Sequence, residues 1–300
     1  MSSQDPCLCM NLKGHKKAVT DISFNPKQVE FASSSEDNSI IVWHGQEKMR
    51  SYNFIGHTNK VTALEYSPNG KLFASASADF SVRLWVPTIR GGYTDFKPHQ
   101  STIRTVSFSN DGSQIITGAH DKSIKLWDSK TQKFITSFLG HNSWVRCAKF
   151  SPDGSMLISC SDDRTIRMWD TRSGHLIHTF PLIKSSPQYI AVHKNNNYIA
   201  AAIDSGSVRL YDVKSRKLQQ HYTLHEQATC VDWHPEANYL ISSGTEGRLV
   251  IVDVMEGRPL YTLTGHKEDV NTVKFSHDGE YFASGGKDDH VRVWKTNFII

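Results

Sequence analysis

The chain has 300 residues and a formal net charge of +4, from 34 lysines and arginines against 30 aspartates and glutamates. This excess is too small to indicate nucleic acid or an anionic membrane as a specific partner. Hydrophobic residues make up 38% of the chain and charged residues 21%, which predicts a folded protein and excludes a disordered linker.

Three further features concern the cellular compartment. The longest apolar run, residues 198–203, is much shorter than the roughly 18 residues that a membrane helix needs. The N-terminus lacks the basic and apolar segments of a secretory signal. The five cysteines are odd in number and form no Cys-x-x-Cys pair, which disfavours both a disulfide framework and a zinc site. We therefore expect a protein of the reducing cytoplasm, without a membrane anchor.

The chain repeats with a period of about 42 residues, the strongest signal in the sequence. Histidines mark the period, most of them after glycine: His15, His57, His99, His141, His225 and His266. Tryptophans 28 residues further on keep the same spacing: Trp43, Trp85, Trp127, Trp169 and Trp294. Seven such repeats fill the chain.

Each repeat predicts short strands separated by tight turns. Alternating β-branched and aromatic residues, as in 145–150 and 165–169, are typical of strands. Between strands, Ser67-Pro68-Asn69-Gly70 and Ser151-Pro152-Asp153-Gly154 fit type I turns, with proline second and glycine fourth. Two similar segments, 109–112 and 276–279, lack the proline. Sustained helical periodicity is absent, so an all-β fold is predicted.

Gly-His and Trp-Asp about 28 residues apart, on a period near 42, resemble the WD-repeat family over residues 7–298. The resemblance implies one seven-bladed β-propeller domain spanning 1–300, built from four-stranded blades. Its repeats would start near residues 14, 56, 98, 140, 182, 224 and 265. Residues 7–13 align with the outer strand that precedes the other repeats, so they are expected to complete the last blade beside residues 291–295.

Four polar positions recur at fixed offsets: histidine, then serine or threonine, aspartate and tryptophan. The complete sets are His15/Ser33/Asp37/Trp43, His57/Ser75/Asp79/Trp85, His99/Thr117/Asp121/Trp127, His141/Ser159/Asp163/Trp169 and His266/Ser284/Asp288/Trp294. A hydrolase triad has no reason to recur five times, and the family resemblance implies a structural hydrogen-bond network in each blade. We therefore expect no catalytic residue, no metal site, no cofactor and no small-molecule substrate.

The fifth and sixth repeats depart from this pattern. Ile183, Ala201, Ser205 and Tyr211 occupy the four positions in the fifth, and Glu246 and Val252 replace aspartate and tryptophan in the sixth. Drift is the simpler interpretation, and functional specialisation is the alternative. Both blades are expected to lack the polar network and to open more readily than the others.

Partner binding is expected on the face that carries the Gly-His loops and the aspartate turns. Trp144 stands where the other repeats have Ala18, Lys60, Thr102 and Asp269, so the repeat pattern does not require an aromatic residue there. Tryptophan and arginine are enriched in interface hot spots, and packing of Trp144 on the neighbouring blade is the alternative. The candidate partner-binding residues are Lys60, Phe80, Arg104, Trp144 and Arg146.

Several off-consensus stretches resemble one subfamily, the proteome-of-centriole WD-repeat proteins. They include Val42-Trp43-His44, Arg83-Leu84-Trp85-Val86-Pro87, residues 144–150, 255–263 and 279–286. The resemblance implies a non-enzymatic scaffold of centrioles and ciliary basal bodies that stabilises triplet microtubules. Its partners would be tubulin and other inner-scaffold proteins of the centriole, and its location the cytoskeleton.

Two rival functions remain open. The segment Trp169-Asp170-Thr171-Arg172 resembles the Trp-Asp-x-Arg box through which some WD-repeat proteins dock on a cullin ubiquitin ligase. Alternatively, the propeller is a general adaptor that reads a peptide at its central channel.

Overall fold

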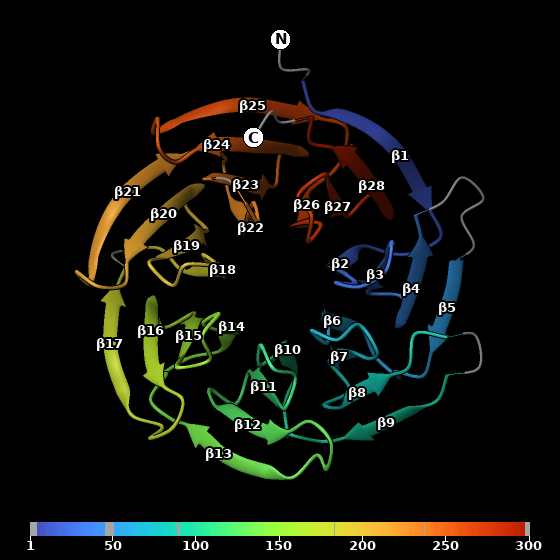
Figure 1. Ribbon diagram of the computed structural model, residues 1–300, viewed down its shortest axis with the longest axis vertical. Coiled ribbons are helices and arrows are strands. Elements are labelled where there is room, and N and C mark those ends of the chain that lie inside the picture. The colour runs from blue at the N-terminus through green and yellow to red at the C-terminus, as the bar shows by residue number, and fades with distance from the viewer. Residues whose placement is uncertain (1–4, 46–50, 89–90, 183, 237, 298–300) are drawn as a thin grey trace.

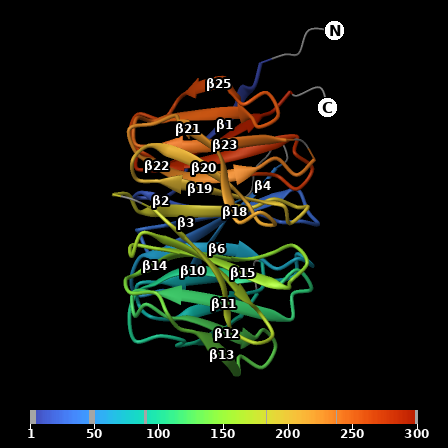
Figure 2. The ribbon, with the colours of Figure 1, turned by 90° about the vertical axis from the view of Figure 1, so that its left-hand side faces the viewer.

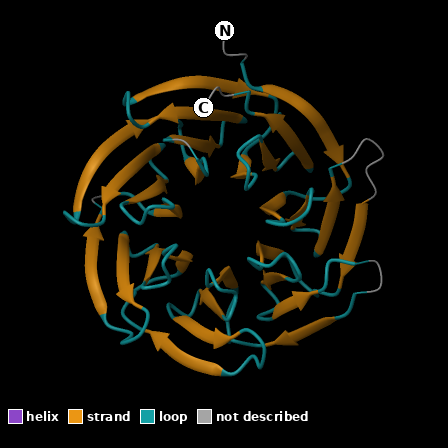
Figure 3. Cartoon of the chain, viewed as in Figure 1, coloured by secondary structure: helices purple, strands orange, loops and turns teal. Residues whose placement is uncertain are grey.

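The computed structural model describes residues 5–45, 51–88, 91–182, 184–236 and 238–297. These residues form strands and loops, without any helix (Figure 3). Seven four-stranded antiparallel sheets, the blades, stand in a ring around a central channel (Figure 1). Seen from its edge, the ring is flat relative to its diameter (Figure 2). The prediction of an all-β, seven-bladed propeller is confirmed. In these residues we find no helix capable of crossing a membrane.

Each blade runs from an inner strand at the channel to an outer strand at the rim (Figure 1). Blade one contains β2 (Val19–Phe24), β3 (Glu30–Ser35), β4 (Ser39–His44) and β5 (Ser51–Ile55). Blade two contains β6 (Val61–Tyr66), β7 (Phe73–Ser77), β8 (Val82–Trp85) and β9 (Tyr93–Phe96). Blade three contains β10 (Ile103–Phe108), β11 (Gln114–Ala119), β12 (Ile124–Asp128) and β13 (Phe134–Phe138). Blade four contains β14 (Val145–Phe150), β15 (Met156–Ser161), β16 (Thr165–Asp170) and β17 (Leu176–Pro181).

The remaining strands complete the ring. Blade five contains β18 (Pro187–Val192), β19 (Tyr198–Ile203), β20 (Ser207–Asp212) and β21 (Lys217–Thr223). Blade six contains β22 (Ala228–Trp233), β23 (Tyr239–Gly244), β24 (Arg248–Asp253) and β25 (Arg258–Thr264). Blade seven contains β26 (Val270–Phe275), β27 (Tyr281–Gly286) and β28 (His290–Lys295), with β1 (Cys7–Lys13) as its outer strand.

The turns between the first two strands follow their sequence signature. Gly70 has a φ of +69° and its N–H donates to the carbonyl of Ser67 at 2.8 Å, which closes the turn. Glycine adopts this left-handed conformation without steric cost. The corresponding glycines of blades three, four and seven have similar φ angles: Gly112, Gly154 and Gly279.

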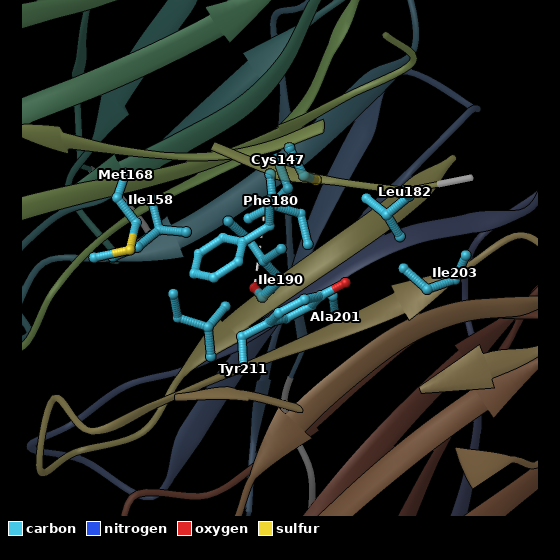
Figure 4. Packing of buried hydrophobic residues seen from close by; sticks show 12 residues of the cluster. Cys147, Ile158, Met168, Phe180, Leu182, Ile190, Ala201, Ile203 and Tyr211 are labelled. Carbon is cyan, nitrogen blue, oxygen red and sulfur yellow. Dashed lines mark hydrogen bonds between the residues drawn. The ribbon is translucent and has the colours of Figure 1, made fainter. Parts of the chain in front are cut away.

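The hydrophobic core lies between the blades rather than within any one of them. In the cluster of Figure 4, Ile158, Met168 and Phe180 of blade four pack against Ile190 and Tyr211 of blade five. Burying these side chains contributes about 1.5–3 kcal/mol each to the free energy of unfolding. Since every blade needs a neighbour on each side, the ring must close to bury all seven interfaces.

Closure is provided by β1, which pairs antiparallel with β28 and joins the two ends of the chain. Leu8 lies opposite Trp294 and Leu12 opposite Val291, with a bulge between Leu8 and Met10. The predicted pairing of residues 7–12 with 291–295 is thereby confirmed. Across the same junction, Val19 and Trp43 of blade one pack in one cluster with residues of blade seven.

Deleting residues 1–13 should lower the melting temperature and cause self-association. The deletion removes β1, so the hydrogen-bonding edge of β28 becomes free to pair with another chain. Thermal unfolding and light scattering would measure both effects, with deletion of residues 1–4 alone as the control. A monomer with an unchanged melting temperature would contradict this role of β1.

Candidate protein-interaction face

A hydrogen-bonded chain of four side chains links the strands of blade four to its loops. The Trp169 Nε1–H donates to the Ser159 Oγ at 2.8 Å, and this Oγ lies 2.8 Å from the His141 Nε2. The His141 Nδ1 lies 2.8 Å from an oxygen of Asp163. Asp163 also accepts the backbone N–H of Asn142 at 3.0 Å. The network therefore ties the loop before β14 to the turn between β15 and β16.

The contacts between the four side chains occur in all five complete sets. The distance from histidine Nε2 to the hydroxyl oxygen is 2.7–2.8 Å throughout. The tryptophan Nε1–H donates to that hydroxyl at 2.8–3.1 Å. The histidines are buried, which keeps this chain of polar groups out of water. Each polar atom is used inside its blade, an arrangement that serves structure rather than catalysis.

The hydroxyl residues at the centre of the five networks lie in the interior of the protein. Each stands on the second strand of its blade and has a relative exposure of 0%: Ser33, Ser75, Thr117, Ser159 and Ser284. Their recurrence in the sequence predicts a structural role, and a partner protein cannot reach a side chain without exposed surface. They therefore do not belong to the interaction face, and their hydroxyls serve only to join histidine and tryptophan within the blade.

Blade six keeps most of the network, so the expectation that it lacks it was wrong. The His225 Nε2 lies 2.9 Å from the Ser242 Oγ, and its Nδ1 lies 3.3 Å from a carboxylate oxygen of Glu246. His225 and Ser242 stand 17 positions apart, one fewer than in the five complete sets, and the glutamate still reaches the histidine. Only the tryptophan is absent, since Val252 takes its place.

Blade five replaces the network by apolar packing. Ala201 is fully buried in the cluster of Figure 4, and the ring of Tyr211 lies 4.7 Å from that of Phe180, centroid to centroid. Ser205, at the aspartate position, is exposed. Ile183, at the histidine position, lies outside the described residues. Blade five thus departs from the pattern by exchanging polar for apolar contacts.

The loops before the inner strands and the turns between the second and third strands meet on one face, here called the upper face. Backbone hydrogen bonds join them, as from the Asp162 N–H to the Trp144 carbonyl at 3.0 Å. At this end of the channel lies a cavity of about 330 Å³, the upper cavity. Lys149 and Tyr189 line it from within the channel and also line a second cavity toward the opposite face.

A β-bulge in every inner strand places one residue in the wall of the upper cavity. The pairing of each inner strand with its neighbour shifts by one residue near its start, as between Ile103 and Thr105 in β10. Bulges re-aim side chains in this way. The residues at the seven bulges all line the cavity: Thr20, Thr62, Arg104, Arg146, Gln188, Thr229 and Asn271.

Four of these seven bulge residues bond to the next blade. Their side chains donate to the carbonyl at the start of the next inner strand: Thr20 to Val61, Thr62 to Ile103, Thr229 to Val270 and Asn271 to Val19. Within the described ranges, Arg104, Arg146 and Gln188 make no such bond. In blades three, four and five the bulge residue therefore lines the cavity without a bond to the next blade.

Three of the five candidate residues, Arg104, Trp144 and Arg146, lie on this part of the upper face. The Trp144 side chain is 46% exposed, and its ring stacks on His120 of blade three with centroids 4.1 Å apart. The Arg146 guanidinium carbon lies 5.9 Å from the Trp144 ring centroid, and two of its nitrogens donate to Asp162 at 2.6 and 2.8 Å. Trp144 therefore both packs on the neighbouring blade and keeps an open face.

The other two candidates are placed differently. Lys60 forms an ion pair with Glu36 at 3.3 Å, with both side chains 43% exposed, so this pair contributes little to stability. Phe80 is 40% exposed in the turn after β7, with a φ of +70°. Neither residue lines the upper cavity.

Sequence reasoning missed His120, Asp162 and Gln188. His120 and Asp162 occupy the position just after the second strand, where other repeats have Glu36, Ala78 or Lys287. Such variation between repeats was the signal that singled out Trp144, and it could have found these residues too. The stacking of His120 on Trp144 depends on two blades lying side by side, whereas Asp162 reaches Arg146 within blade four.

Two further observations concern the ubiquitin-ligase segment and metal binding. Arg172, of the Trp-Asp-x-Arg segment, is exposed in the turn between β16 and β17, at the end of blade four opposite the upper face. In the ranges that the structure covers, no three or more histidine, cysteine or acidic side chains are grouped so as to hold a metal ion.

A comparison with known protein families identifies the family of this chain. The WD domain, G-beta repeat family matches residues 6–44, 48–86, 93–128, 132–170, 216–253 and 257–295. The chain belongs to this WD-repeat family. The unmatched segment of this WD-repeat propeller falls mainly in blade five, where the four polar positions are replaced. WD-repeat propellers are in general non-enzymatic domains that bind proteins, and this one is an interaction scaffold of that kind.

Individual relatives match only short parts of the chain. Human serine-threonine kinase receptor-associated protein is 38% identical over 63 residues, which are 21% of this chain and 18% of the relative. The Dictyostelium discoideum protein of the same name is 34% identical over 74 residues, 25% of either chain. POC1 centriolar protein homolog A from Xenopus tropicalis is 45% identical over 51 residues, 17% of this chain and 12% of the relative. The matched segments thus span a quarter or less of each relative.

Replacing Ser159 by alanine should lower the free energy of unfolding by about 1–3 kcal/mol, because the Trp169 N–H and a His141 nitrogen lose their buried partner. Chemical denaturation would measure the change. Ser205→Ala is the matched control, since this exposed serine of blade five belongs to no such network. An equal effect of both substitutions would contradict the structural role of the network.

The free energy of unfolding should fall in two steps as the solution is acidified. Burial lowers the pKa of His266 to about 4, whereas an unfolded histidine titrates near pH 6.5, so protons favour the unfolded chain below about pH 6.5. Burial alone would raise the pKa of Asp121, but hydrogen bonds from His99 and Ser123 outweigh it and hold this pKa at about 2. Its contribution is therefore lost between about pH 4 and 2. Denaturation curves from pH 8 to 2 test this; stability that rises between pH 6.5 and 4 would contradict it.

Proposed function

We propose that this protein is a non-enzymatic scaffold of centrioles and ciliary basal bodies, which stabilises triplet microtubules and supports centriole and cilium assembly. The observation that carries the proposal is the 45% identity, over 51 residues, to a Xenopus tropicalis protein named as centriolar. The off-consensus stretches of the sequence point to the same subfamily. The cytoskeleton of the cytoplasm is the location that this function requires.

The upper face supplies the chemistry that a scaffold needs. An exposed tryptophan beside two arginines has the composition of an interface hot spot. Tubulin of the triplet microtubules and other inner-scaffold proteins are the partners that we propose. The mild positive charge of the chain suits the acidic surface of tubulin.

A second candidate is a signalling adaptor. Human serine-threonine kinase receptor-associated protein is 38% identical over 63 residues, and its name says that it associates with a receptor. The same upper face could serve such an adaptor. The docking segment for a cullin ligase rests on Arg172 alone and carries less weight.

The endogenous protein, tagged with a fluorophore in ciliated cells, should appear at centrioles and basal bodies. Its depletion should leave unstable triplets and fewer or defective cilia, because the scaffold that holds the triplets is lost. Re-expression of the tagged protein is the control for off-target effects. Diffuse or nuclear signal with intact centrioles would contradict the centriolar function, and enrichment with a membrane receptor kinase would favour the adaptor.

A further inference from the structure

Arg104 lines the upper cavity and forms no ion pair with the residues that the structure describes. Its Nε is buried and meets no hydrogen-bond acceptor among the residues that the structure describes. Burial and the nearby Arg146 lower the pKa of Arg104, although a guanidinium stays charged at neutral pH. The residue as a whole is only partly buried and lines the cavity, so its guanidinium is accessible to an acceptor supplied from outside.

The other charged groups around the cavity already have partners. Arg146 is held by Asp162, and Lys149 is paired with Glu65. Among the acids, Glu36 is paired with Lys60. Asp204 accepts the Ser186 N–H, and Asp21 accepts the Ile22 and Leu64 N–H groups and the Thr272 hydroxyl. Among the described residues that line the cavity, Arg104 is thus the one charged side chain for which the structure shows neither a hydrogen bond nor an ion pair.

A second unsatisfied atom lies beside the cavity. The Nε2 of His120 is buried without a hydrogen-bond partner in the described part of the chain. His120 also forms the base on which Trp144 stacks. Two unused nitrogens, Arg104 Nε and His120 Nε2, therefore occur in the same blade, next to an exposed aromatic ring.

Blade three also gives up a stabilising contact at Arg104. Threonine at the equivalent bulge of blade two donates to the carbonyl of Ile103 at 2.6 Å, and Thr20 makes the same bond from blade one. Threonine at position 104 would be expected to reach Val145 in the same way. The arginine is therefore not required by the fold, which favours a role in binding.

We propose that the upper cavity binds an acidic peptide segment of a partner protein, whose aspartate or glutamate side chain pairs with Arg104 while a neighbouring peptide residue packs on Trp144. The inference rests on the proposed role of the propeller as a scaffold that binds proteins. It adds the chemistry of the partner and the residue that selects it.

The single charge of Arg104 favours a carboxylate over a phosphate group as its ligand. One unpaired guanidinium matches a single negative charge, whereas a phosphorylated side chain carries between one and two. The acids Glu36 and Asp204 at the cavity wall would oppose the additional charge. A volume of about 330 Å³ has room for one inserted side chain rather than a folded element.

The test is selection of random peptides displayed on phage against the full 300-residue chain, followed by fluorescence anisotropy with the selected peptides. Aspartate or glutamate should be enriched at one position. Arg104→Thr should weaken binding of such a peptide about tenfold to hundredfold, because a charge-assisted hydrogen bond is lost. Arg104→Glu should instead select lysine or arginine at that position, and Trp144→Ala should weaken binding of the acidic peptide.

Arg164→Asn is the matched control, because Arg164 is exposed on the same face and does not line the cavity. Asparagine tolerates the φ of +64° at this position. The control should leave binding unchanged, and Arg104→Thr should leave the melting temperature unchanged or higher. Absence of an acidic preference, an acidic preference that Arg104→Thr does not alter, or stronger binding of phosphoserine than of glutamate would each overturn the inference.

Failure of this inference and failure of the proposed function give different results. A wild-type protein that reaches centrioles but shows no acidic preference would overturn the inference alone. A protein that selects acidic peptides through Arg104 but stays away from centrioles would support the inference and contradict the centriolar function.

Discussion

Closure of the ring is the constraint on which the rest of the structure depends. A four-stranded blade has two apolar faces and can cover neither of them alone, so each blade needs two neighbours. The pairing of β1 with β28 supplies the last contact and joins residues almost 300 positions apart in the chain. Contacts between distant residues are entropically costly to form, and here one pairing secures the interfaces of all seven blades.

In every blade except the fifth, a polar network joins the loops to the strands. Buried hydrogen bonds hold the loops of the upper face to the strands. Blades five and six show that the network is one solution among several. Blade six uses a longer acid, and blade five uses Ala201 and Tyr211 in an apolar cluster. The scaffold accepts such exchanges because the neighbouring blades supply most of the burial.

The bulge residues show which blades lack a bond to the next blade and offer a side chain to a partner instead. Blades one, two, six and seven use theirs to bond to the next blade, as a purely structural ring would do throughout. Arg104, Arg146 and Gln188 break this series in three consecutive blades, below the stacked pair of His120 and Trp144. Natural proteins depart from local structural rules mainly at functional sites. The break in the series therefore marks the part of the upper face that is specialised for a partner.

The sequence by itself determined the seven repeats, the all-β architecture, the closing strand and the five polar networks. These follow from local spacing and from residue types that recur, so one repeat explains the next. It also singled out Trp144 as a residue that the repeat pattern does not require, and named Arg104 and Arg146 as further candidates for partner binding. Only the tertiary structure decided what they do: that Arg146 is neutralised by Asp162, that Trp144 rests on His120, and that Arg104 forms no ion pair with the described residues. These contacts join different strands or different blades, and the distances between such elements are set by the closed ring rather than by spacing along the chain.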